Sequence, residues 1–274
     1  MIIKTLVENT SISKDFGNEH GLSLYIETNA LKILFDVGAS ELFLENAKKL
    51  DVNISDIDYL IISHGHYDHG GGLRMFFKEN TKAKVFLQCF AFEKYHALRP
   101  NDTLEFIGLE EELKQNRQIV LTSDQFFISK GIEVFSNITQ RKPRPMSNAG
   151  LLIEQNGQMM NDTFAHEQNL ILEEDGKTLL VTGCAHNGIV NIIEHFYDLK
   201  GSMPDYVIGG FHLSSRSSGG NENFETIDKI SRFLIDTKAK YYTCHCTGLE
   251  PYNRLKAAMG NSIDYLSVGS EITI

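Results

Sequence analysis

The sequence is poor in basic residues, cysteine and long apolar runs. Its 26 Lys and Arg residues are outnumbered by 36 Asp and Glu residues, which gives a net charge of −10 and argues against a nucleic-acid partner. The four cysteines have no spacing typical of a disulfide framework, so a reducing compartment, the cytoplasm, is expected. The sequence has no transmembrane run and no signal-peptide pattern, so no membrane partner is expected either.

No long segment rich in Pro, Gly and Ser divides the 274 residues. The longest patch of low complexity, residues 214–221, is predicted to be a mobile loop between a histidine motif and a helix. Apolar residues make up 42% of the chain, enough to fill one large core. We therefore expect one domain over residues 1–274, and the sequence leaves its oligomeric state open.

Strand-like and helical patterns alternate along both halves of the chain. In the first half we expect a helix at 41–50 and strands at 2–7, 22–27, 32–36, 59–62 and 84–87. In the second half we expect helices at 189–199, 224–237 and 250–259, and strands at 150–154, 170–173, 178–182, 206–208 and 241–243. Two such halves favour an α/β (α+β) fold with two packed sheets and helices outside, an αββα sandwich.

The most informative segment is His64-Gly65-His66-Tyr67-Asp68-His69, which follows the apolar run at 59–62. Neutral imidazole and carboxylate together suit zinc, iron or manganese. His64 and His66 point the same way from an extended strand end, and Asp68 and His69 follow where the chain enters a helix. Four ligand-type residues in this fixed frame favour a divalent-metal site over a charged surface loop.

Other candidate site residues also follow directly after expected strands. They are Asp36, Cys184, His186, His212 and His245. Loops that leave one edge of a sheet sandwich build a common site, so these side chains are expected to converge. His96 and His195 instead lie inside helical patterns without ligand-type neighbours, and we assign them to packing.

The HxHxDH segment at 64–69, together with Leu34-Phe35-Asp36-Val37-Gly38, resembles the metallo-β-lactamase superfamily over nearly the whole chain. The motifs EHGLS at 19–23, TGCAH at 182–186, GGFHL at 209–213 and CHCTG at 244–248 are similar to the branch named for dihydropterin-ribofuranosyl-aminobenzene-phosphate synthase. The resemblance implies a four-layer αββα sandwich. Because most members of this branch have no assigned substrate, it says little about chemistry.

The resemblance also implies a ligand set. His64 and His66 would bind a first metal ion, and Asp68, His69 and His245 would bind a second. Two residues compete for the remaining place at the first ion. His166 stands 18 residues before Cys184, as in the family, whereas His186 lies two residues beyond Cys184 and is the preferred candidate.

Cys184 stands where many members of the superfamily carry an Asp that bridges two metal ions. Its thiolate could ligate zinc or iron, so a site with two ions or with one is possible, and a buried inert thiol is the alternative. Asp36 is expected to hold the ligand histidines in place by hydrogen bonds.

Three further segments are candidates for substrate contact. His212 precedes the Ser/Gly-rich loop and is expected to act as an acid or to contact phosphate, and His20 is a weaker candidate for the same role. Arg141 and Arg144 lie on a segment stiffened by proline that could attract an anionic substrate, although a solvated loop is the more common explanation of such charges.

These assignments predict a hydrolase in which one or two divalent ions, zinc first and iron or manganese as alternatives, activate water against an ester or phosphoester of a small molecule. Asp68 would orient the water and His212 would protonate the leaving group. One alternative is a condensing transferase like the synthase of that branch. A non-catalytic metal or redox sensor is the other.

Overall fold

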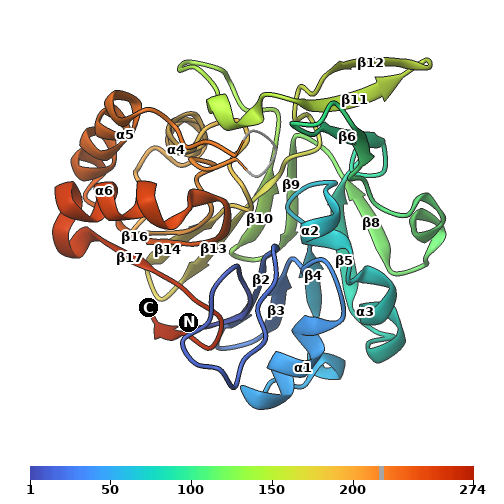
Figure 1. The fold of residues 1–274 in the computed structure, drawn as a ribbon. Coiled ribbons are helices and arrows are strands. Elements are labelled where there is room, and N and C mark those ends of the chain that lie inside the picture. The colour runs from blue at the N-terminus through green and yellow to red at the C-terminus, as the bar shows by residue number, and fades with distance from the viewer. Residues whose placement is uncertain (216–218) are drawn as a thin grey trace.

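The structure is a computed structural model that describes residues 1–215 and 219–274. Two seven-stranded sheets and one four-stranded sheet make up its β structure (Figure 1). The first sheet has the order β18 (Glu271–Thr273), β1 (Ile2–Val7), β2 (Ser23–Glu27), β3 (Lys32–Phe35), β4 (Tyr59–Ile61), β5 (Lys84–Gln88), β8 (Ile119–Thr122). The second has the order β17 (Ile263–Tyr265), β16 (Lys240–Thr243), β15 (Tyr206–Gly209), β14 (Lys177–Val181), β13 (Asn169–Glu174), β10 (Ile132–Phe135), β9 (Gln125–Ser129).

The third sheet has the order β12 (Gln158–Asn161), β11 (Leu151–Gln155), β6 (Lys94–Leu98), β7 (Leu104–Phe106). The α-helices are α1 (Leu42–Lys49), α2 (Tyr67–Gly70), α3 (Leu73–Glu79), α4 (Ile189–Lys200), α5 (Phe224–Thr237) and α6 (Leu249–Met259). Short 3₁₀ helices occupy Ile54–Asp56, Glu111–Gln115, Met146–Asn148, His245–Thr247 and Gly260–Ser262.

Successive residues of a strand point to opposite faces of its sheet. Each large sheet therefore buries one apolar face against the other sheet and its second face beneath helices. In β3, Ile33 and Phe35 join the core between the sheets, whereas Leu34 joins the core beneath α1 and α3. In β13, Leu170 faces the inter-sheet core and Ile171 faces the core beneath α4, α5 and α6. Figure 1 shows these helix groups on opposite sides of the sheets, so the predicted four-layer αββα fold is confirmed.

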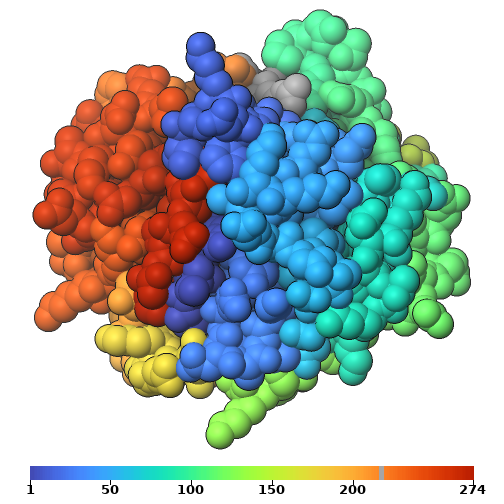
Figure 2. All heavy atoms as spheres, turned by 90° about the horizontal axis from the view of Figure 1, so that it is seen from below, coloured from blue at the N-terminus to red at the C-terminus, as the bar shows by residue number. Residues whose placement is uncertain are grey.

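The two ends of the chain meet at the edge of the first sheet. β18 pairs antiparallel with β1, and the terminal amine of Met1 donates to the carbonyl oxygen of Ile274 over 2.7 Å. Figure 2 shows the red C-terminal segment beside the dark-blue N-terminal strand on the lower face.

The expected elements differ from the structure in specific places. The strand expected at 150–154 exists as β11, but it belongs to the third sheet, which the sequence analysis did not predict. The helical assignment of His96 was wrong, because β6 alternates buried Tyr95 and Ala97 with more exposed neighbours, a period of two rather than 3.6. His195 does lie in α4, where its ring stacks on Phe135.

Two other expectations concern mobility and membranes. The predicted mobile loop at 214–221 lies partly outside the described residues, and its described ends, Ser214 and Asn221, form an isolated antiparallel bridge. Among the described helices, none combines the length and the apolar character that crossing a bilayer would require.

The inter-sheet core predicts a large effect for Leu170→Ala, because Leu170 is fully buried (0% exposed) between the sheets. We expect its free energy of unfolding in urea with a chelator to fall by about 2–5 kcal/mol. Phe127→Ala on the edge strand β9 is the control, since this side chain is 70% exposed, and it should change stability by less than about 0.5 kcal/mol. Equal effects would contradict the two-sheet packing.

Candidate metal centre

The site lies at one edge of the sandwich because parallel strands in both large sheets end there. β3 and β4 are parallel neighbours in the first sheet, and β14, β15 and β16 are parallel neighbours in the second. Strand-end loops and α2 supply buried polar side chains: Asp36, His64, His66, Asp68, His69, Cys184, His186, His212 and His245. The convergence expected from strand ends is therefore observed.

The first cluster contains His64, His66 and His186, whose potential ligand atoms lie within 4.8 Å of one another. The Nε2 atoms of His64 and His186 face each other at 3.3 Å. His66 is also buried, and its Nε2, 3.9 Å from a carboxylate oxygen of Asp162, has no hydrogen-bond partner among the described residues.

Hydrogen bonds from outside fix which nitrogens of this cluster face inward. The Ser63 hydroxyl donates to Asp36 and therefore accepts from Nδ1 of His64, 2.8 Å away. Nδ1 of His186 lies 2.9 Å from the amide oxygen of Asn148 and donates to it. Both Nε2 atoms are then left with lone pairs, which is the form that binds metal. Burial, reinforced by the neighbouring imidazoles, holds the pKa of His64 and of His186 well below the usual value, so both rings are neutral.

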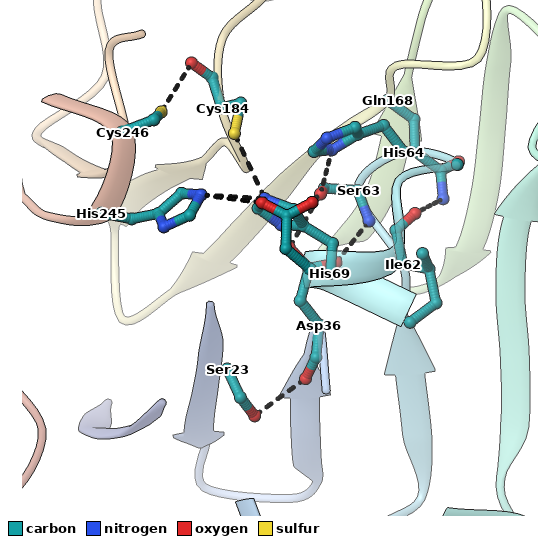
Figure 3. A network of polar contacts seen from close by, with 12 residues as sticks. Ser23, Asp36, Ile62, Ser63, His64, His69, Gln168, Cys184, His245 and Cys246 are labelled. Atoms are coloured by element: carbon teal, nitrogen blue, oxygen red, sulfur yellow. Dashed lines mark hydrogen bonds and ion pairs between the residues drawn. The ribbon is translucent and has the colours of Figure 1, made fainter. Parts of the chain in front are cut away.

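The second cluster surrounds His69 (Figure 3). Nε2 of His69 lies 3.2 Å from Sγ of Cys184, 3.3 Å from Nε2 of His245 and 3.6 Å from a carboxylate oxygen of Asp68. Nε2 of His245 and Nε2 of His20 each lie 3.3 Å from the same oxygen of Asp68. His20, with 30% of its side chain exposed, thus stands at the solvent side of this cluster.

Carboxylates surround the second cluster. Nδ1 of His69 donates to Asp36 over 2.6 Å, as expected for a residue that holds the site histidines, and Nδ1 of His245 lies 2.9 Å from the amide oxygen of Asn9. Burial opposes a charged ring, but Asp36 and Asp68 outweigh it and raise the pKa of His69 to about 9. Burial likewise opposes ionisation of Asp68, yet the nearby imidazoles, His69 first, hold its pKa well below the usual value. These carboxylates favour positive charge at this point, whether a proton or a metal ion.

His166 lies behind the first cluster. Its Nδ1 accepts from the backbone N–H of Gly65 over 2.8 Å, and its Nε2 donates to Asp162 over 3.0 Å. The ring stacks on Tyr95 with a centroid distance of 3.9 Å. Both nitrogens are therefore occupied by protein partners, whereas His186 keeps Nε2 directed at His64.

Two cysteines and one histidine lie beside the clusters and line the same small pocket: Cys184, Cys246 and His212. Burial raises the pKa of the Cys184 thiol well above its usual value in the metal-free protein. Cys246 donates from Sγ to the Cys184 carbonyl oxygen over 3.4 Å. The His212 ring lies 4.2 Å from the His186 ring, and neither of its nitrogens has a hydrogen-bond partner among the described residues.

The two arginines occupy different places. Arg141 is exposed and forms an ion pair with Asp198 of α4 at 2.6 Å, so it is not brought to the clusters. Arg144 donates to the Asn187 amide oxygen over 3.1 Å, and its guanidinium lies 5.6 Å from the centre of the Phe164 ring. Phe164 in turn stacks on His186, which places Arg144 one ring away from the first cluster.

A small cavity of about 60 Å³ opens over the clusters. The third sheet and its loops form one wall of it, through Ala97, Arg99, Ile107 and Leu151. His66, Asp68, Cys184, His186, His212, His245 and His20 line it as well. A molecule in this cavity would therefore contact both clusters, His212 and the cation of Arg99.

Sequence reasoning missed several residues that shape this site. Glu167 accepts from the backbone N–H groups of His186 and Asn187, over 2.5 and 3.0 Å, and so fixes the loop that follows β14. Glu8 accepts from the backbone N–H of His245 over 2.7 Å. The position of Glu8 just after the first expected strand follows the same strand-end rule that identified the other residues. For Asn148 and Arg99 no such sequence signal exists.

Three comparisons bear on this arrangement. Residues 17–86 match the family model of the metallo-β-lactamase superfamily. An uncharacterised protein of Methanocaldococcus jannaschii is 31% identical over 279 residues that span all of both chains. From the same archaeon, a 7,8-dihydropterin-6-methyl-4-(β-D-ribofuranosyl)-aminobenzene-5'-phosphate synthase is 31% identical, covering 98% of this chain and 95% of its own length. The solved structure of Tm1679, a metal-dependent hydrolase of the β-lactamase superfamily, matches 100% of this chain and 99% of its own with 27% identity and a TM-score of 0.84.

The hydrogen bonds of Glu167 predict that Glu167→Gln destabilises the metal-free protein. The amide keeps the shape of the side chain, but its NH₂ group cannot accept from the backbone donors of the 186–187 turn. We expect a loss of about 1–3 kcal/mol in urea unfolding with a chelator present. Glu79→Gln at an exposed position of α3 is the matched control and should change stability by less than about 0.5 kcal/mol. Equal stability of the two variants would argue against this role of Glu167.

Proposed function

The chain belongs to the metallo-β-lactamase superfamily, whose members are mostly metal-dependent hydrolases, and we propose that it hydrolyses an ester or phosphoester of a small molecule with the help of one or two divalent metal ions. One observation carries this proposal. Four buried histidines share one arrangement: His64, His69, His186 and His245. In each ring Nδ1 lies within hydrogen-bond distance of an oxygen atom, and Nε2 lies 3.2–3.3 Å from another potential metal-ligand atom. At His64 and His186, whose rings are neutral, the Nε2 lone pairs repel each other unless a cation lies between them, and the raised pKa of His69 reflects the same preference for positive charge.

We assign His64, His66 and His186 to one ion, and Asp68, His69 and His245 to a second. Three nitrogens in the first set and a mixed nitrogen and oxygen set in the second suit zinc, with iron or manganese as alternatives. His166 is excluded from our assignment because both of its nitrogens are engaged.

Cys184 is assigned as a further ligand, shared by the two sets. Its sulfur groups within 4.8 Å with His64 and His69, and also with His245 and Cys246. A thiolate in this place would bring the negative charge that the bridging Asp supplies in many relatives. Sulfur is a soft ligand, which supports zinc or iron over manganese.

When bound, a divalent ion would lower the pKa of water towards about 7 and polarise the substrate oxygen. The residues of the chain supply the remaining functions. Asp68 lines the cavity and can accept a hydrogen bond from the attacking water, which orients it. His212 lines the same cavity with both nitrogens free of described partners, so it can deliver a proton to the leaving group. Arg99, which lines this cavity and pairs with Glu105 at 2.6 Å, and Arg144, which lies behind Phe164, are assigned to receive an anionic group. Arg141 is not assigned this role, because it is not brought to the clusters.

A condensing transferase is the second candidate, because a relative that matches 98% of this chain is named as a synthase. Release of pyrophosphate on mixing a pterin diphosphate with a ribosyl-aminobenzene phosphate would favour it. Hydrolysis of ester probes without condensation would favour the hydrolase. We also propose a cytoplasmic location, which the four free cysteines support.

The ligand assignment predicts different metal contents for two histidine variants. Replacing a residue that only supports a ligand commonly weakens metal binding by about 10–100-fold, so loss of a direct ligand in His186→Ala should cost at least that upper value. His166→Ala removes a supporting residue and should weaken binding less, by about 10–100-fold. Elemental analysis after dialysis against zinc buffers measures both, with folding checked by circular dichroism. The reverse order of the two variants would show that His166 is the ligand.

The assigned roles also predict the kinetics of hydrolysis. Chelation should abolish turnover and added zinc should restore it. His212→Gln should lower kcat by about 10²–10⁴-fold with unchanged metal content, because it removes proton transfer but no ligand. His96→Gln on β6, outside the cavity, is the matched control and should keep kcat. Full activity after complete metal removal would disprove the hydrolase proposal.

A further inference from the structure

A second and much larger cavity lies on the helix side of the metal centre. It has a volume of about 630 Å³ and is bounded by residues 142–146, the first turn of α4 and one face of α5. Figure 1 shows α4 and α5 side by side. Sites for small organic molecules usually measure roughly 300–1,000 Å³, so this cavity can hold such a molecule, whereas the pocket over the metal ligands measures only about 60 Å³.

The cavity has an apolar interior with aromatic side chains. Its apolar lining consists of Ile189, Val190, Phe211, Leu213, Ile230 and Phe233. Phe211 and Leu213 are buried and belong to the segment that carries His212, and Phe233 lies on α5. Pro143 and Pro145 stiffen the opposite wall. Such a lining accepts a planar apolar group and gives little to a highly polar one.

Two cations that form no ion pair with a described residue lie at the rim of this cavity. Of the lining cations, Lys229 pairs with Glu225 at 2.7 Å, but neither Lys142 nor Arg144 forms an ion pair with a described residue. The Nε atom of Arg144 is buried without a hydrogen-bond partner among those residues.

The acidic lining residues do not neutralise these cations. Glu222 is buried, and its oxygens accept from the backbone N–H of Met146 over 2.9 Å and from Asn223 over 3.1 Å. Asp236 is exposed on α5. In a protein of net charge −10, two cations beside an apolar cavity that no described carboxylate pairs with favour an anionic ligand.

We propose that this cavity binds a small molecule with a planar apolar body and one acidic group, such as an aromatic carboxylate, sulfonate or phosphate ester. The apolar body packs against Val190, Ile230 and Phe233, which are partly exposed to the cavity. The acidic group pairs with Lys142 and Arg144.

The cavity and the metal pocket share a wall. Met146 and Leu213 line the cavity, and the residues that follow them in the sequence, Ser147 and Ser214, line the metal pocket. Arg144 also contacts Asn187, which directly follows His186. The ligand is therefore either the remote part of the substrate or a separate small molecule. That the ligand is part of the substrate rests on the proposed hydrolase function. That the cavity binds such a ligand does not.

The test uses 1-anilinonaphthalene-8-sulfonate, a fluorescent aromatic sulfonate, with the full-length protein. We expect saturable binding at one site, weakened at least about 10-fold by Ile230→Trp, which fills the cavity, and several-fold by Lys142→Glu, which reverses a charge. Ile235→Trp on the same helix is the matched control, because Ile235 is 43% exposed and lies outside the cavity, and its affinity should stay within about twofold of the wild type.

Circular dichroism in the near ultraviolet checks that each variant retains native packing, since partly folded proteins also bind this dye. If Ile230→Trp does not fold, Val190→Trp fills the cavity from α4 and replaces it. Absence of saturable binding by the wild type, or equal binding by the filled variant, overturns the proposal.

A second measurement separates the two sources of the ligand. Competitive inhibition of turnover by the dye identifies the cavity as part of the substrate site, and noncompetitive inhibition or none identifies a separate ligand site. Because dye binding is measured without turnover, a failure to find hydrolase activity leaves the binding result intact.

Discussion

The burial of imidazoles and carboxylates around one point is the constraint on which the rest of this structure depends. Polar groups removed from water destabilise a fold unless each finds a partner. At His69, His186 and His245 an inward-facing Nε2 requires an outward-facing Nδ1 with an acceptor, so Asp36, Asn148 and Asn9 must stand at fixed distances from these rings. These acceptors come from loops far apart in the sequence, which ties the geometry of the site to the packing of the whole sandwich.

The same constraint explains unusual backbone conformations at the site. Asp36, His212 and His245 adopt positive φ angles of 61°, 50° and 51°, which non-glycine residues rarely adopt. Close approach also leaves no space for side chains: a Cβ atom at Gly183 would lie 2.1 Å from Oγ of Ser63. The strand-end loops are thus bent sharply so that side chains of both sheets reach a common point.

The sequence allowed prediction of what depends on local pattern. Strand ends after apolar runs identified His64, Cys184 and His245, and alternation within β3 and β13 follows the two cores. The third sheet was not predicted because β7 and β12 are short and exposed, so their sequences show no alternation of buried and exposed residues. The roles of Asn9 and Asn148 were not predicted because these residues contact His245 and His186, which lie 236 and 38 residues away in the sequence. Only the tertiary fold creates such contacts. The position of Arg141 depends likewise on Asp198, 57 residues away.

Each large sheet supplies about half of the assigned metal ligands. His64, His66, Asp68 and His69 follow β4 of the first sheet, whereas Cys184, His186 and His245 follow β14 and β16 of the second. The sheets also exchange hydrogen bonds here. Gln168 beside β13 donates to the Ile62 carbonyl oxygen over 2.8 Å (Figure 3). Glu8 after β1 accepts from the N–H of His245. A cation held by both sets would link the sheets at this edge. Its binding free energy would therefore stabilise the packing of one sheet on the other, so metal affinity and fold stability are properties of the same contacts.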